Sequence, residues 1–275
     1  MTKDRIDRRF AALKAENRAG FVTYVMAGDP DAVTTLEVLK GLPGAGADLI
    51  ELGFPFSDPM AEGPTIQRAA QRGLASGMTL QGTLDLVAAF REGDQDTPVI
   101  LMGYLNPVLN KGFETFAALA ARAGVDGLII VDCPPEEADP LSDALEAEGI
   151  ALIRLAAPTT DDARLPMVVR RTSGFVYYVS VAGVTGVKSA NAAEVAPAVE
   201  RLRKASGLPV AVGFGIRTPD QAAAVAMVAD AAVVGSALVD EIEAAARLNE
   251  NVTEKVLLKA AELAKAVRSA RVGTK

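Results

Sequence analysis

Eight short runs of apolar, mostly β-branched or aliphatic residues recur along the chain, and this repeat limits the possible folds more than any other feature. Amphipathic, alanine-rich stretches such as 116–122, 194–205 and 221–228 separate most of them. The runs lack a clean apolar–polar alternation, as expected for strands that are covered on both faces. Strands that alternate with helices indicate parallel βα units. The eight predicted strands are 21–25, 48–52, 99–102, 127–131, 150–155, 175–179, 210–212 and 231–234.

Eight such units in about 250 residues match the size of an α/β fold of the (β/α)8, or TIM barrel, type. A doubly wound sheet is the alternative that the pattern leaves open. No linker, internal repeat or low-complexity tract interrupts the chain, so residues 1–275 are predicted to form a single TIM-barrel domain.

Helix-start signals support this count. Asp29-Pro30 predicts a capping aspartate followed by proline at the first helical position, and 218–221 predicts a capping box. Near the N-terminus, Ile6, Phe10 and Leu13 fall on one helical face. No strand precedes that helix, so it is predicted to cover the bottom of the barrel.

Composition excludes several classes of function. The formal net charge of -7 argues against nucleic acid or an anionic membrane as the main partner. Cys133 is the one cysteine, which favours a reducing, cytoplasmic location, and no apolar segment has the length of a membrane span. The chain has no histidine, so acid–base chemistry near neutral pH must use carboxyl groups, lysine, tyrosine or cysteine. A zinc site of cysteine and histidine ligands is likewise excluded.

The segment ELGFPFSDPMAEGP, residues 51–64, carries the first candidate active-site residues. Glu51 ends an apolar strand, and in a TIM barrel such a side chain faces the mouth, where the chemistry occurs. Removal from water there raises a carboxyl pKa and produces a usable acid or base. The alternative is a structural glutamate paired with an arginine or a backbone amide. Glu62 lies in the stiff loop that follows and is a weaker candidate, because a loop carboxylate is usually solvated.

The ends of the third and fourth strands are less specific. Tyr104, Asn106 and Pro107 predict a shaped loop for a ligand or a protein surface. Asp132 is either catalytic or a brace for its turn, and Cys133 is expected to be a buried apolar residue.

Glycines follow the sixth, seventh and eighth strands. They lie in the loop 183–186, in Gly213-Phe214-Gly215 and in Gly235-Ser236, which opens a predicted helix. Free amide groups at a helix start bind anions, and TIM barrels often hold phosphate at this position. Tight turns that require glycine are the alternative. Together with the carboxyl groups, the pattern favours an isomerase or lyase that acts on a sugar phosphate.

The sequence resembles the tryptophan synthase alpha chain family. The resemblance rests on four motifs in order: ELGFPFSDPMAEGPTIQRA, GVTG after a YxxS strand, GFGI and GSA. The resemblance runs from about Phe21 to Ala237. It implies retro-aldol cleavage of indole-3-glycerol phosphate to indole and glyceraldehyde 3-phosphate, with no metal or cofactor in this chain. It assigns the acid–base role to Glu51 and that of the second catalytic acid to Glu62, where the family usually has aspartate. The added methylene extends the reach of Glu62 by about 1.5 Å, and a misplacement near 1 Å can cost on the order of a hundredfold in rate.

The resemblance also assigns roles to other positions. Tyr177 matches a tyrosine near the reacting atoms, Tyr24 stands where the family often has a phenylalanine of the indole pocket, and Thr185 matches a lid threonine. The phosphate-binding positions that match are Gly186, Gly215, Gly235 and Ser236.

A partner is implied as well. The resemblance implies a pyridoxal-phosphate beta chain in an alpha2-beta2 heterotetramer, and it directs Pro55, Asp58, Asn106 and Pro107 toward that chain. Two alternatives remain: a different phosphate-binding barrel enzyme, and a catalytically weak subunit that mainly activates its beta partner.

Overall fold

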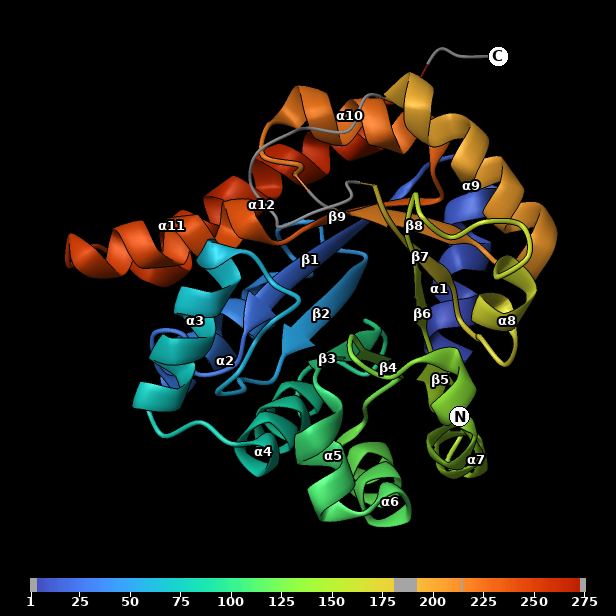
Figure 1. Cartoon of the computed structure of the whole chain (residues 1–275). Helices are drawn as coiled ribbons and strands as arrows, with labels where there is room; N and C mark the ends of the chain where they lie inside the picture. The colour runs from blue at the N-terminus through green and yellow to red at the C-terminus, as the bar shows by residue number, and fades with distance from the viewer. Residues whose placement is uncertain (1–3, 181–191, 214, 273–275) are drawn as a thin grey trace.

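The computed structural model describes residues 4–180, 192–213 and 215–272 and shows a ring of strands surrounded by helices (Figure 1). The strands are β1 (Gly20–Met26), β2 (Leu49–Gly53), β3 (Val99–Gly103), β4 (Gly127–Ile130), β5 (Ala151–Leu152), β6 (Arg154–Ala156), β7 (Val176–Val179), β8 (Val210–Gly213) and β9 (Ala231–Val234). The helices are α1 (Asp4–Ala15), α2 (Ala32–Gly41), α3 (Pro64–Ala75), α4 (Leu80–Arg91), α5 (Leu105–Lys111), α6 (Phe113–Ala123), the 3-10 turn η1 (Pro135–Glu137), α7 (Asp139–Ala147), α8 (Leu165–Val169), α9 (Ala192–Ser206), α10 (Pro219–Val228), α11 (Ser236–Arg247) and α12 (Val252–Ser269).

All strand pairs are parallel, in the order β5-β4-β3-β2-β1-β9-β8-β7-β6. The two strands at the ends of this order, β5 and β6, are consecutive in the chain and are separated by Ile153 alone. The predicted fifth strand, 150–155, is therefore present as two short pieces, one paired to β4 and the other to β7, and this closes the ring. The (β/α)8 barrel and the positions of all eight predicted strands are confirmed.

The barrel interior is closed at its bottom by α1. Ile6, Phe10 and Leu13 are the buried residues of this helix and join the inward-facing strand residues in one apolar cluster. The Phe10 ring lies 5.6 Å from that of Phe175, directly before β7, measured between ring centres. The predicted N-terminal helix and its place at the barrel bottom are confirmed.

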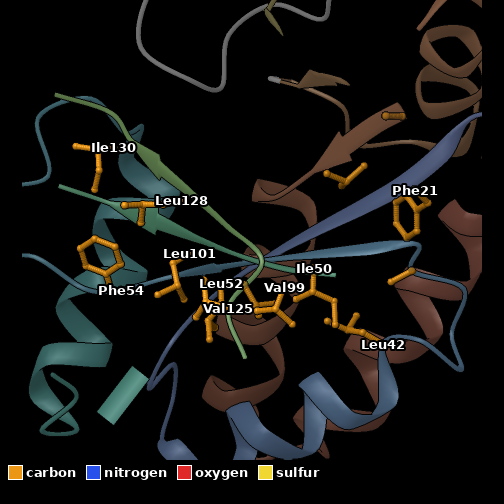
Figure 2. Packing of buried hydrophobic residues seen from close by; sticks show 14 of the residues in the cluster. Phe21, Leu42, Ile50, Leu52, Phe54, Val99, Leu101, Val125, Leu128 and Ile130 are labelled. Atoms are coloured by element: carbon orange, nitrogen blue, oxygen red, sulfur yellow. The ribbon is translucent and has the colours of Figure 1, made fainter. Parts of the chain in front are cut away.

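Outward-facing strand residues form the larger apolar layer beneath the helices. Figure 2 shows part of it, where Ile50, Leu52, Val99, Leu101 and Leu128 lie on neighbouring strands. Both faces of each strand are thus covered, and this explains why the sequence shows apolar runs without alternation.

One helix start differs from the prediction. Asp31 caps α2, because its carboxylate accepts a hydrogen bond from the Thr34 backbone N–H at 2.8 Å. The predicted cap, Asp29, is buried instead, and its two carboxylate oxygens accept from the Arg72 guanidinium at 2.7 and 2.8 Å. The capping box predicted at 218–221 is present at the start of α10.

Three aspartates at the bottom of the barrel form hydrogen bonds that join neighbouring strands. Each directly precedes a strand, donates its own N–H to a carbonyl on the adjacent strand, and accepts that residue's N–H at 2.8 or 2.9 Å. The pairs are Asp48 with Phe21, Asp126 with Val99, and Asp230 with Val210. Each carboxylate also binds arginine: Arg18 for Asp48, Arg5 and Arg91 for Asp126, and Arg203 for Asp230.

Replacement of Asp126 tests how much such an aspartate and its ion pairs contribute to the stability of the fold. The Asp126 side chain is fully buried, and it neutralises Arg91, which is itself buried, across 2.6 Å. We expect Asp126→Asn to lower the free energy of unfolding by about 3 kcal/mol, because it leaves a buried charge uncompensated. Urea denaturation measures the loss. Asp230→Asn is the matched control, since its arginine is half exposed and its loss should stay below about 1 kcal/mol. Equal losses would contradict this account.

Candidate active site

Glu51 lines a cavity at the barrel mouth. It lies on β2 in register with Tyr24 of β1 and Ile100 of β3, and its side chain is 1% exposed. Among the described residues, neither carboxylate oxygen has a hydrogen-bond partner. Burial raises the pKa of Glu51 to about 8. A buried carboxyl without a structural partner is costly for folding, and such groups cluster at functional sites.

Two tyrosines lie beside Glu51. The Tyr24 hydroxyl lies over Gly53 and the Tyr177 hydroxyl lies over Gly213, each where a glycine leaves room for it. Burial, followed by nearby carboxylates that include Glu51, raises the pKa of both phenols well above their ordinary value. Both tyrosines therefore stay neutral and can donate hydrogen bonds near Glu51.

Glu62 enters the mouth from the loop between β2 and α3. The Tyr104 hydroxyl donates a hydrogen bond to its carboxylate and accepts one from the Ala61 N–H at 2.8 Å. Tyr104 is buried and stacks on Phe56, with ring centres 5.1 Å apart. Burial raises the pKa of Glu62 to about 7, against a smaller opposing effect of a backbone hydrogen bond, and the negative charge of Asp132 adds the least.

The opposite side of the mouth is formed by the ends of β8 and β9. Gly215 has a φ of 81°, a left-handed conformation that favours glycine. Gly235 is the residue before α11, and no described side chain caps that helix start. Amide groups that are uncapped at a helix start are available to an anion.

One cavity joins these groups and encloses about 540 Å³ of empty space, its open mouth included. The predicted site residues that line it are Tyr24, Glu51, Glu62, Tyr177, Gly215, Gly235 and Ser236. The predicted positions Thr185 and Gly186 lie outside the described residues.

The cavity also has residues that the sequence interpretation missed. Met102 and Val233 face inward from β3 and β9, and Ile66 and Gly63 lie at the start of α3. The inward-facing positions of Met102 and Val233 could have been predicted, because side chains alternate along each strand and Glu51 marks the inward face. The segment predicted as a shaped loop is helix α5 from Leu105 on, and Tyr104, which directly precedes this helix, donates a hydrogen bond to Glu62.

Other strand-end residues have structural places. An Asp132 carboxylate oxygen accepts from the Leu105 N–H at 2.7 Å and so braces the start of α5. Cys133 is buried, as predicted.

The four predicted partner-facing residues are not all at the surface. Asp58 and Asn106 are exposed and Pro107 is half-buried, whereas Pro55 is buried beside Gly73 of α3.

Within the described ranges, no three cysteine, aspartate or glutamate side chains gather closely enough to hold a metal ion. In the same part of the chain, no helix combines the length and apolar character that crossing a membrane requires.

The fold and this site define an enzyme of the TIM-barrel class, with two carboxyl groups of raised pKa at the mouth of the barrel. Residues 10–268 match the family model described as tryptophan synthase alpha chain, and the chain belongs to this family. It is a lyase of L-tryptophan biosynthesis, which cleaves indole-3-glycerol phosphate to indole and D-glyceraldehyde 3-phosphate in the alpha reaction.

Similar proteins agree with this assignment. A tryptophan synthase alpha chain from Caulobacter vibrioides is 96% identical over 275 residues, the full length of both chains. One from Phenylobacterium zucineum is 74% identical and covers 98% of each chain. The crystal structure of the alpha subunit from Legionella pneumophila has a TM-score of 0.89 at 40% identity, over 96% of this chain and 98% of that one. None of these similarities supports the alternative of a subunit that mainly activates a partner.

Proposed function

We propose that Glu51 carries the proton transfers of the alpha reaction. The single observation that carries this proposal is its buried carboxyl group, which has no hydrogen-bond partner among the described residues. With a pKa of about 8, Glu51 is mostly protonated at neutral pH. It donates this proton to indole C3, and the ring becomes an indolenine. The resulting carboxylate then takes the proton of the C3' hydroxyl. The C3–C3' bond breaks, its electron pair returns to the ring, and the aldehyde C=O forms.

Glu62 acts on the ring nitrogen in this proposal. C3 protonation places positive charge on that nitrogen, and a carboxylate nearby stabilises it. Tyr104 and the stacked Phe56 hold the longer glutamate side chain at the mouth. Tyr177 is the neutral donor near the reacting atoms, and Tyr24 lines the indole pocket. The lid role of Thr185 rests on the resemblance alone.

The substrate phosphate binds on the opposite side of the cavity. Its support is the left-handed glycine at 215 together with the uncapped start of α11 at Gly235 and Ser236. Both segments line the cavity that contains Glu51. Gly186 is added by the resemblance. This arrangement holds the indole and phosphate ends of one substrate across the barrel mouth.

A beta chain that carries pyridoxal phosphate is the proposed partner, in an alpha2-beta2 heterotetramer; this chain itself binds no cofactor. Asp58, Asn106 and Pro107 would face it. Two large apolar side chains support a protein contact there, since Met60 of the loop after β2 is 82% exposed and Leu109 of α5 is 56% exposed. Pro55 shapes the loop from beneath.

The test is indole formation from indole-3-glycerol phosphate with and without the beta chain. We expect slow release by this chain alone and an increase of at least about tenfold with saturating beta chain, because the contact loop is continuous with Glu62. Met60→Ser with Leu109→Ser should weaken the partner-dependent increase and leave the rate of the isolated chain unchanged. An unchanged partner response in that variant would contradict the proposed contact surface.

A further inference from the structure

Asp240 forms hydrogen bonds to two other segments that border the cavity. It lies on α11, four residues after Ser236. One of its carboxylate oxygens accepts a hydrogen bond from the Arg217 guanidinium, and the other accepts one from the Thr65 hydroxyl at 3.0 Å. The Arg217–Asp240 contact is also an ion pair.

The segment that contains Arg217 follows the cavity-lining residues Gly215 and Ile216. The backbone N–H of Arg217 donates to the Gln221 side chain at 2.8 Å, which ties this segment to the start of α10. Its side chain ties the same segment to α11 through Asp240. The loop after β8 is therefore held between two helices.

Thr65 connects Asp240 to the other side of the cavity. It is the second residue of α3, three positions after Glu62 and next to the cavity-lining Ile66. A single carboxylate thus joins the loop after β8, the start of α11 and the start of α3.

We propose that Asp240 is a positioning residue that fixes the spacing of the phosphate-binding segments. It touches no substrate atom in this account. The two carboxylate oxygens of Asp240 bind one partner each, the arginine and the threonine. This inference rests on the proposed phosphate site at Gly215, Gly235 and Ser236.

Asp240→Ala tests the inference, with glycerol 3-phosphate as the probe and calorimetry as the measurement. We expect its Kd to rise about tenfold, the KM for indole-3-glycerol phosphate to rise in the same proportion, and kcat to change less than about threefold. Asp240→Asn should restore binding to within about threefold, because the amide oxygen can accept from Arg217 and the amide N–H can donate to Thr65. The double variant Asp240→Ala with Arg217→Ala should bind no more weakly than the weaker single variant.

Glu243→Ala is the matched control. Glu243 lies on the same helix and pairs with Arg68 and Arg72 of α3. It therefore also joins α11 to α3, but these pairs do not reach the segment that contains Arg217. Its removal should change the Kd less than twofold. An equal rise in both variants, or a Kd for Asp240→Ala within twofold of the wild type, would overturn the inference.

Ser236→Asp separates this inference from the proposed phosphate site. A carboxylate in the first turn of a helix favours the helix but repels a bound phosphate. Loss of glycerol 3-phosphate binding in this variant supports the site, and the Asp240 result then decides the inference alone. Unchanged binding would overturn the site itself, whatever Asp240→Ala shows.

Discussion

Glu51→Gln is expected to lower kcat/KM for indole formation by about a thousandfold or more. The amide keeps the size of the side chain but can neither donate a proton to indole C3 nor take one from the C3' hydroxyl. Acid–base catalysis by one group contributes roughly 10²- to 10⁴-fold, and here one carboxyl serves two transfers. The chain has no histidine that could replace it. The assay is indole release from indole-3-glycerol phosphate in the presence of saturating beta chain.

Activation of the beta partner is the control for a folded variant. Glu51 lies inside the barrel and away from the proposed contact surface, so Glu51→Gln should activate the beta chain as the wild type does. Turnover within tenfold of the wild type would remove Glu51 from the mechanism.

Stability against pH gives an independent check on the same residue. The pKa of Glu51 is about 8 in the folded chain, against an ordinary value of 4.5. The folded state therefore holds a proton that the unfolded chain releases, and stability falls as pH rises from 4.5 to about 8. The expected loss is about 1.4 kcal/mol for each pH unit between these values. Glu51→Gln should lack this part of the slope in urea denaturation at a series of pH values.

The barrel could be predicted because each of its strands is encoded by a short stretch of neighbouring residues. Each strand is a short run of apolar residues, and two-sided burial is visible in every run, from β1 to β9. Glu51 was predictable for the same reason, since a charged residue at the end of such a run stands out. The N-terminal helix followed from the spacing of Ile6, Phe10 and Leu13 alone.

The remaining features depend on contacts between distant segments. Asp29 has the sequence signature of a helix cap, but Arg72, 43 positions later, binds it and leaves capping to Asp31. The raised pKa of Glu62 depends on burial in a loop that Tyr104, between β3 and α5, binds through the Ala61 N–H. Asp240 looks like any exposed helix residue until Arg217 and Thr65 are placed beside it. No local pattern encodes these pairings.

Glu62→Gln should lower kcat/KM by about a hundredfold, because it removes the negative charge that stabilises the protonated indole ring. The pH profile adds a sharper expectation. The active free enzyme has Glu62 ionised and Glu51 protonated, so kcat/KM rises with pH through about 7 and falls through about 8. The neutral amide that this substitution introduces cannot ionise, so the acid limb should disappear while the alkaline limb stays.

Glu62→Asp separates the charge of the second acid from its length. It restores the residue usual in the family and keeps the charge, so we expect it to match or exceed the wild-type rate and to retain both limbs of the profile. The opposing effect is the contact with Tyr104, which an aspartate would have to reach with one methylene fewer. A rate that collapses to that of Glu62→Gln would show that Tyr104 and Phe56 have shaped this mouth around the longer acid. In that case Tyr104→Phe should lower the wild-type rate and leave that of Glu62→Asp unchanged, because only the glutamate would depend on the hydroxyl.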